Sequence, residues 1–128
     1  MNRKPRPMRR MRVEDYSLCK CTVAKTAEGG TYDTFGDPVF FRGEVWPAGG
    51  KVQAELYGER IRYIRNIRIE GEYTIEQGSD GQMHYVFDDG LDVCERDGLC
   101  LYTEGNDPDY QIISIRPTRP LRLEAEKR

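Results

Sequence analysis

The chain has 128 residues, 33% of them charged and 38% hydrophobic, and its formal net charge at pH 7 is -2. This length is typical of one domain with a moderate hydrophobic core. No apolar run approaches the roughly 20 residues of a helical membrane span, and the basic N-terminus lacks the apolar segment of a secretory signal. We therefore expect a single domain without a membrane partner.

Basic residues dominate the N-terminal segment, residues 1–15. Before the first acid, at Glu14, the sequence contains Arg3, Lys4, Arg6, Arg9, Arg10 and Arg12. Blocks of like charge are commonly flexible, so a flexible basic arm is the first interpretation. The second is an arm that becomes ordered on a neighbouring subunit or on nucleic-acid phosphates. An acidic cluster could oppose this arm in a head-to-tail ring, and it consists of Asp88, Asp89, Asp92, Glu95 and Asp97.

The first half of the chain predicts two strands and one short insertion. Residues 16–25 alternate as a strand does, and residues 28–38 are rich in Gly, Asp and Pro, which predicts a long turn. Residues 39–46 are β-branched and aromatic, which predicts a second strand. Residues 51–58 are either a short helix that needs docking for its stability or an extended loop. The apolar side chains at helical spacing are Val52, Leu56 and Tyr57.

The second half predicts strands only. Ile and Arg recur over residues 59–70, which predicts a strand with a bend or bulge at Arg65 and Asn66. A hairpin and a closing meander follow, with strands over 73–76 and 82–87, then 97–102, 109–117 and 121–124. Short strands separated by turn signals indicate an all-β barrel or sandwich of antiparallel strands over residues 16–128, with one helix or loop inserted.

Neither a metal site nor a cofactor is expected from the four cysteines, which are Cys19, Cys21, Cys94 and Cys100. In a strand, the side chains of Cys19 and Cys21 would start about 6–7 Å apart on one face. Neither that pair nor the six-residue step from Cys94 to Cys100 matches the usual ligand spacing of structural zinc. We expect reduced thiols that behave as small, buried or half-buried hydrophobes.

Catalytic motifs are absent from the sequence. His84 is the single histidine and falls in a predicted strand, where a surface or packing role is the usual one. No nucleophile elbow, P-loop or dinucleotide-binding glycine motif occurs. Acidic pairs such as those at 88–89 and 107–109 lie in predicted turns, where Asp commonly caps the backbone. The sequence therefore predicts a protein that is not an enzyme.

A basic and aromatic segment is the best candidate binding surface. It contains Arg60, Arg62, Arg65 and Arg68, with Tyr57 and Tyr63 nearby. These side chains could form a solvated strand face. They could also bind single-stranded nucleic acid by stacking and charge, or form a polar interface between subunits.

The order of the segments resembles the head–tail connector family of tailed bacteriophages and prophages, the head-completion or stopper proteins. The segments that carry this resemblance are YDTFGDP at 32–38, VWP at 45–47, GG at 49–50, LYG at 56–58, DYQI at 109–112, IRP at 115–117 and LRLE at 121–124. The resemblance covers about residues 16 to 126. The hairpin and acidic turn over 70–93 and the basic arm depart from the family pattern.

The resemblance implies a small β-barrel that assembles into a homo-oligomeric ring below the portal and adaptor. Such a ring closes the DNA-filled head and receives the tail, and its subunit can be a monomer in isolation. In that family the segment after the second strand, here residues 47–60, projects toward the channel as a plug, and its exposed candidates here would be Lys51, Gln53, Glu55 and Tyr57. Contact with packaged DNA would be non-specific. The resemblance places the chain in the virion and, during assembly, in the bacterial cytoplasm.

Two other functions are consistent with the same sequence. A tail-completion or tail-terminator protein would also be a structural subunit of a ring. A small β-barrel that binds nucleic acid through Arg60 to Arg68 would instead lose affinity steeply as salt rises.

Overall fold

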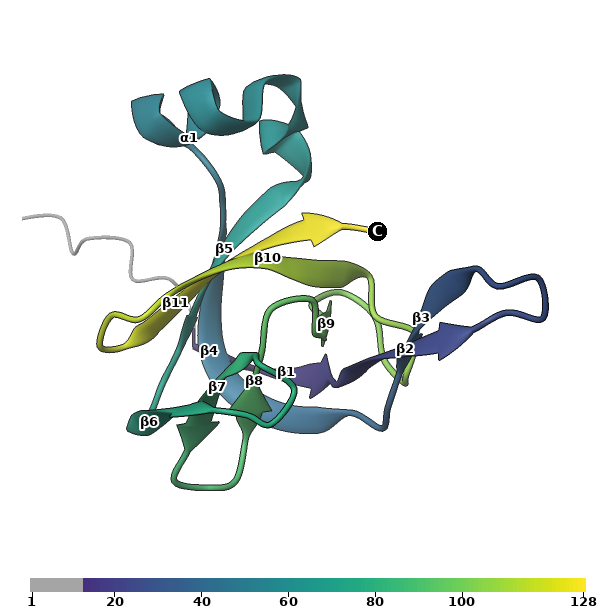
Figure 1. Ribbon diagram of the computed structural model, residues 1–128. Helices are drawn as coiled ribbons and strands as arrows, with labels where there is room; N and C mark the ends of the chain where they lie inside the picture. The colour runs from purple at the N-terminus through teal and green to yellow at the C-terminus, as the bar shows by residue number, and fades with distance from the viewer. Residues whose placement is uncertain (1–12) are drawn as a thin grey trace, which may run out of the picture.

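Six antiparallel strands close into a barrel in the computed structural model, which describes residues 13–128. The barrel strands are β1 (Glu14–Cys19), β4 (Val39–Pro47), β5 (Ile64–Ile69), β9 (Gly98–Cys100), β10 (Tyr110–Arg116) and β11 (Leu121–Lys127). Around the barrel they follow the order β1-β4-β5-β11-β10-β9, so that strands from both halves of the chain lie side by side (Figure 1). The prediction of a small all-β barrel of short antiparallel strands is confirmed.

Two smaller sheets extend the barrel. The strands β2 (Cys21–Lys25) and β3 (Thr31–Phe35) pair as a hairpin that projects from the barrel wall (Figure 1). The strands β6 (Tyr73–Gln77), β7 (Met83–Phe87) and β8 (Asp92–Val93) form the other sheet. Tyr73, Phe87 and Val93 belong to the same buried cluster as the barrel residues, so this second sheet packs on the barrel core. The predicted hairpin over 73–87 is confirmed.

The first predicted strand and the long turn after it are partly wrong. The strand breaks at Lys20, where the chain leaves the barrel, and residues 31–35 of the predicted turn form β3. The break has a tertiary cause: the amide of Cys21 donates to Oδ1 of Asp97, and the Lys20 carbonyl accepts from the amide of Gly36. Also, β1 begins at Glu14, so the barrel starts two residues before the expected boundary at residue 16.

The short insertion is helical, as one interpretation of the sequence predicted. Helix α1 (Gly50–Tyr57) and the 3-10 helix η1 (Gly58–Tyr63) join β4 to β5 and project from the barrel (Figure 1). Gly58, with a φ of 57°, ends α1 and turns the chain into η1, so the strand predicted from residue 59 begins only at Ile64. The expected bulge at Arg65 and Asn66 is absent, because β5 pairs with both neighbours without a register shift. The register shift lies in β10 instead.

The barrel core follows the period of two that a pleated strand imposes. In β11, Leu121 and Leu123 are buried and Arg122 between them is exposed. In β5, Ile67 and Ile69 are buried opposite them. Each such side chain stabilises the fold by roughly 1.5–3 kcal/mol when it is fully removed from water. The barrel is therefore a filled core, and binding must use its outer face, its ends or its insertions.

The cysteines are free thiols, three of them buried (Cys19, Cys94 and Cys100) and Cys21 half-buried, which confirms the expected burial. No helix within residues 13–128 combines the length and apolar composition needed to cross a bilayer. Most of the predicted basic arm lies outside the described residues.

Candidate functional site

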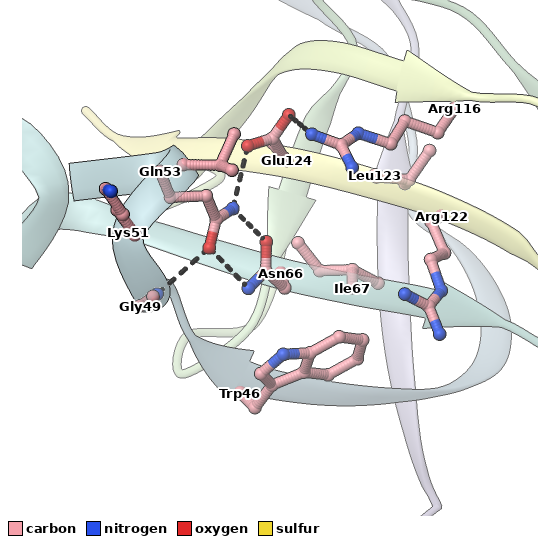
Figure 2. A pocket seen from close by; sticks show the side chains of 12 residues that line it. Trp46, Gly49, Lys51, Gln53, Asn66, Ile67, Arg116, Arg122, Leu123 and Glu124 are labelled. Atoms are coloured by element: carbon pink, nitrogen blue, oxygen red, sulfur yellow. Dashed lines mark hydrogen bonds and ion pairs between the residues drawn. The ribbon is translucent and has the colours of Figure 1, made fainter. Parts of the chain in front are cut away.

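Helix α1 lies over the outer face of the barrel without burying any of its own residues. Gln53 reaches from the helix to the barrel wall and makes four hydrogen bonds at its base (Figure 2). Its Nε2 donates to Oδ1 of Asn66 on β5 at 2.6 Å and to Oε2 of Glu124 on β11 at 2.8 Å. Its Oε1 accepts from the amide of Gly49 at 2.9 Å and from Nδ2 of Asn66 at 3.2 Å. The docking of α1 therefore depends on a polar network and not on an apolar stripe.

Glu124 is the buried member of this network, with 4% of its surface exposed. It stands on the outward face of β11, where its neighbours Leu123 and Ala125 point to the core. A carboxylate in that position would be solvated if α1 did not cover it. Nη2 of Arg116 lies 3.8 Å from its Oε1 and provides a partial counter-charge. Burial, reinforced by the Glu124 carboxylate, raises the pKa of Tyr57 to about 12, so this phenol stays neutral at physiological pH.

A cleft of about 390 Å³ opens between α1 and the barrel wall. It is lined by Trp46, Gly49, Gly50, Lys51, Val52, Gln53, Asn66, Ile67, Arg116, Arg122, Leu123 and Glu124. Figure 2 shows Trp46 and Arg122 bordering the same space as the Gln53 network. Cationic and aromatic groups can contact an acidic or aromatic side chain of a partner. Among the described residues that line the cleft there is no second carboxylate or imidazole to form an acid–base pair with Glu124.

The four residues expected to be exposed on the insertion divide into two pairs. Lys51 and Glu55 are exposed, whereas Gln53 and Tyr57 are half-buried against the barrel side, so the expectation of exposure is wrong for these two. The reason is that the network of Glu124 binds Gln53 and turns that face of α1 inward.

Two of the three apolar residues of the predicted helical stripe are exposed, and only Tyr57 is half-buried. Val52 and Leu56, expected to dock the helix, are 70% and 63% exposed. They are four residues apart and therefore share one helix face. The periodicity of the sequence predicts that these two side chains share a face, but it does not predict whether the barrel covers that face.

The four arginines of the predicted binding surface do not share one face. Arg60 and Arg62 lie in η1, and Arg65 and Arg68 lie on β5 at opposite parity. Arg60 makes two hydrogen bonds to the carboxylate of Glu126, at 2.8 and 2.6 Å. These two charges are therefore already paired with each other.

The other three arginines are also engaged. Arg68 forms an ion pair with Glu44, and Arg65 donates to the carbonyls of its own turn, at 3.1 and 3.2 Å. The guanidinium of Arg62 lies over the Tyr63 ring, 5.0 Å from its centroid. A continuous basic strand face for nucleic acid is therefore not what the fold presents.

Further large side chains are exposed on the projecting hairpin and the adjoining strand. They are Val23 and Tyr32 on the hairpin, 55% and 52% exposed, and Val39 and Phe40 on β4, 47% and 73% exposed.

No protein-family model, curated protein or solved structure matches the chain.

Proposed function

We propose that the chain is a structural subunit of the head–tail connector of a tailed bacteriophage or prophage. In this role it forms a ring below the portal or adaptor that closes the filled head and receives the tail. The observation that carries the proposal is the α1–η1 segment, which projects from the barrel wall between β4 and β5 and buries none of its residues. In the connector family, which the order of segments resembles, the corresponding segment projects toward the channel.

The exposed apolar residues of α1 support a role in assembly. Val52 and Leu56 each leave more than half of their surface in water. Covering such a side chain completely contributes roughly 1.5–3 kcal/mol. Two such side chains contribute too little free energy for a stable dimer in dilute solution. Around a preformed template, the free energies of repeated contacts add together. A subunit that is monomeric in solution and forms a ring on its template has this pattern.

The partners that this proposal implies are portal or adaptor subunits above, tail subunits below and copies of the same chain beside it. Packaged DNA would meet the projecting segment through charge and shape, without base-specific contacts. The exposed Lys51 at the start of α1 is suited to such contact with phosphate. Tail completion is the neighbouring role that the same features allow.

The nucleic-acid-binding alternative is weaker. The carboxylates of Glu126 and Glu44 already pair with Arg60 and Arg68. Phosphates would have to displace these carboxylates, so the net gain per contact is small. A free chain that bound single strands tightly, with affinity falling steeply as salt rises, would favour this alternative.

The order of reading frames around the gene tests the proposal first. Phage assembly genes commonly follow the order of the particle, so portal, capsid and adaptor frames should lie upstream and a tail-tube frame downstream. A locus with none of these frames would contradict the connector role. A locus that places the chain after the tail tube would assign it to tail completion instead.

A pair of variants tests the projecting face itself. Changing Val52 and Leu56 together to Ser removes no buried contact, so we expect wild-type thermal stability but a loss of head-to-tail joining in a complementation assay. The matched control is Ile75→Ser on β6, which is 45% exposed and lies on a different element. Normal joining by the double variant would show that this face is not the contact.

A further inference from the structure

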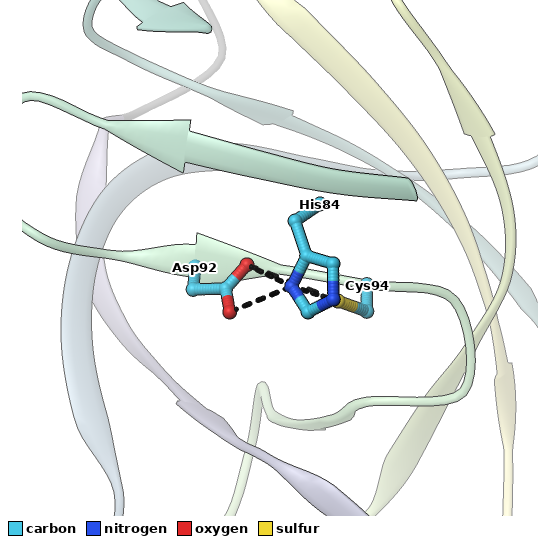
Figure 3. Close-up of side chains that lie close together, drawn as sticks. All are labelled: His84, Asp92 and Cys94. Carbon is cyan, nitrogen blue, oxygen red and sulfur yellow. Dashed lines mark hydrogen bonds and ion pairs between the residues drawn. The ribbon is translucent and has the colours of Figure 1, made fainter. Parts of the chain in front are cut away.

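Three potential metal ligands converge where β7 meets β8. The register of this pair sets Tyr85 against Val93 and Val86 against Asp92, so its next step places His84 opposite Cys94. Asp92 lies two residues before Cys94 and therefore on the same face of the strand. Figure 3 shows the three side chains pointing toward one another, with the imidazole between the carboxylate and the sulfur.

The distances between their donor atoms resemble the edges of a tetrahedral site. Nδ1 of His84 lies 3.0 Å from Oδ1 of Asp92 and 3.2 Å from Sγ of Cys94, and Sγ lies 3.8 Å from the same Oδ1. Bond lengths of zinc to sulfur, nitrogen and oxygen of about 2.3, 2.0 and 2.1 Å give tetrahedral edges of about 3.4–3.6 Å. The three donors therefore need movements of only a few tenths of an ångström to bind one ion.

The far side of the imidazole has the support that a ligating histidine usually receives. Nε2 of His84 lies 3.4 Å from Oδ1 of Asp80, in the turn between β6 and β7. A carboxylate on the second ring nitrogen fixes the tautomer that leaves Nδ1 free to bind a metal. Gly78 in the same turn packs closely against the ring, and a Cβ at this position would lie only 2.5 Å from Nε2. The ring is thus held in its orientation from behind.

Local charges are compatible with a divalent cation. The ammonium of Lys20 lies 3.7 Å from Oδ2 of Asp92, but its shortest contact is to Oδ2 of Asp97 at 2.7 Å. Asp97 is 1% exposed, so it belongs to this interior pair and not to the surface acidic cluster expected from the sequence. With Lys20 and Asp97 neutralising each other, a thiolate, a carboxylate and a neutral imidazole leave a charge that one divalent ion balances.

A cysteine nucleophile is the other chemistry that these residue types allow, and the geometry disfavours it. In a triad the acid and the nucleophile contact different ring nitrogens, whereas here Asp92 and Cys94 share Nδ1.

We propose that His84, Asp92 and Cys94 bind one Zn²⁺ ion through Nδ1, a carboxylate oxygen and Sγ, with water in the fourth position. The ion displaces the thiol proton, because a coordinated thiol is deprotonated. It fastens β8, a strand of two residues, to β7 and so rigidifies the second sheet. The site departs from the expectation that the cysteines bind no metal, since that expectation considered cysteine spacing alone.

Metal titration of the full chain tests the proposal. The reduced, metal-free protein is titrated with Zn²⁺ alone in competition with a chromophoric chelator, and Co²⁺ serves as a spectroscopic probe of sulfur ligation. We expect one Zn²⁺ per chain and a thiolate-to-cobalt charge-transfer band. Both should be lost in Cys94→Ser and His84→Gln and retained in the control Cys21→Ser, whose half-buried thiol lies outside the cluster.

Circular dichroism and thermal melts of the metal-free proteins separate loss of binding from loss of folding. Asp80→Asn removes no ligand, and we expect it to weaken zinc affinity by about tenfold, as such supporting partners usually do. Failure of the folded wild-type chain to bind Zn²⁺, or binding that persists in both ligand variants, would overturn the site. Neither outcome bears on the connector role, which uses a different part of the molecule.

Discussion

Replacing Gln53 by Ala should detach α1 while the barrel stays folded. The variant removes the donor that reaches Asn66 Oδ1 and Glu124 Oε2. A hydrogen bond to a charged group contributes about 1.5–3 kcal/mol, and a neutral one about 0.5–1.5 kcal/mol. Because α1 has no fully buried residue, the half-buried Tyr57 is the main remaining contact with the barrel side. A helix of eight residues is not stable alone, so the segment should open locally.

The expected free energy change depends on how the partners of Gln53 are solvated after α1 opens. Once α1 lifts, water reaches Glu124 and Asn66, so most of the cost appears in local opening and little in global unfolding. We expect amide exchange in residues 50–57 to accelerate by about 10- to 100-fold, which corresponds to about 1.4–2.8 kcal/mol. The free energy of global unfolding, from urea denaturation, should fall by less.

Hydrogen exchange resolved by residue measures both quantities. The matched control is Glu55→Ala, an exposed substitution on the same helix, which should leave exchange of α1 unchanged. Wild-type protection of α1 in Gln53→Ala would show that Gln53 does not hold the helix on the barrel. Equal losses of protection in α1 and in the barrel strands would contradict local opening, because they would show that the helix is part of the cooperative core.

Two other substitutions test individual ion pairs, one buried and one at the surface. Asp97→Ala leaves a lysine and two backbone amides without their carboxylate, and we expect a loss of about 2–4 kcal/mol of unfolding free energy in urea, against almost none for the exposed Asp107→Ala. A loss below 1 kcal/mol would contradict this assignment. The hydrogen bond from the guanidinium of Arg60 lowers the pKa of Glu126. The pair therefore stabilises the fold fully above the ordinary carboxyl pKa, and this stabilisation is lost as the pH falls through the lowered pKa. The difference in Tm between the wild type and Glu126→Gln should therefore be largest near neutral pH and vanish in acid; a constant difference would contradict this.

The barrel was predictable because its signals are local. Leu121 and Leu123 alternate with polar residues, and the Gly-rich turn near residue 80 separates two short strands, as the structure has them. The break at Lys20 was not predictable, because its cause is Asp97, more than seventy residues away in the chain. For the same reason β3 was hidden in a segment whose composition indicates a turn.

The candidate sites show the same limit. Glu124 is a charged residue at an outward strand position, so the sequence predicts that it is exposed to solvent. It is buried because α1 docks over it through Gln53. Likewise His84 and Cys94 are ten residues apart in a spacing that indicates no metal, and the register of β7 and β8 brings them together. Local periodicity predicts which face a side chain takes, but not what covers that face.

The connector role is tested most directly by disrupting the gene in its host, inducing particle production and imaging the particles by electron microscopy. We expect free tails beside heads that have lost their DNA, with normal particles restored by the wild-type gene but not by the Val52 and Leu56 double variant. Intact, tailed and infectious particles made without the chain would contradict the connector role.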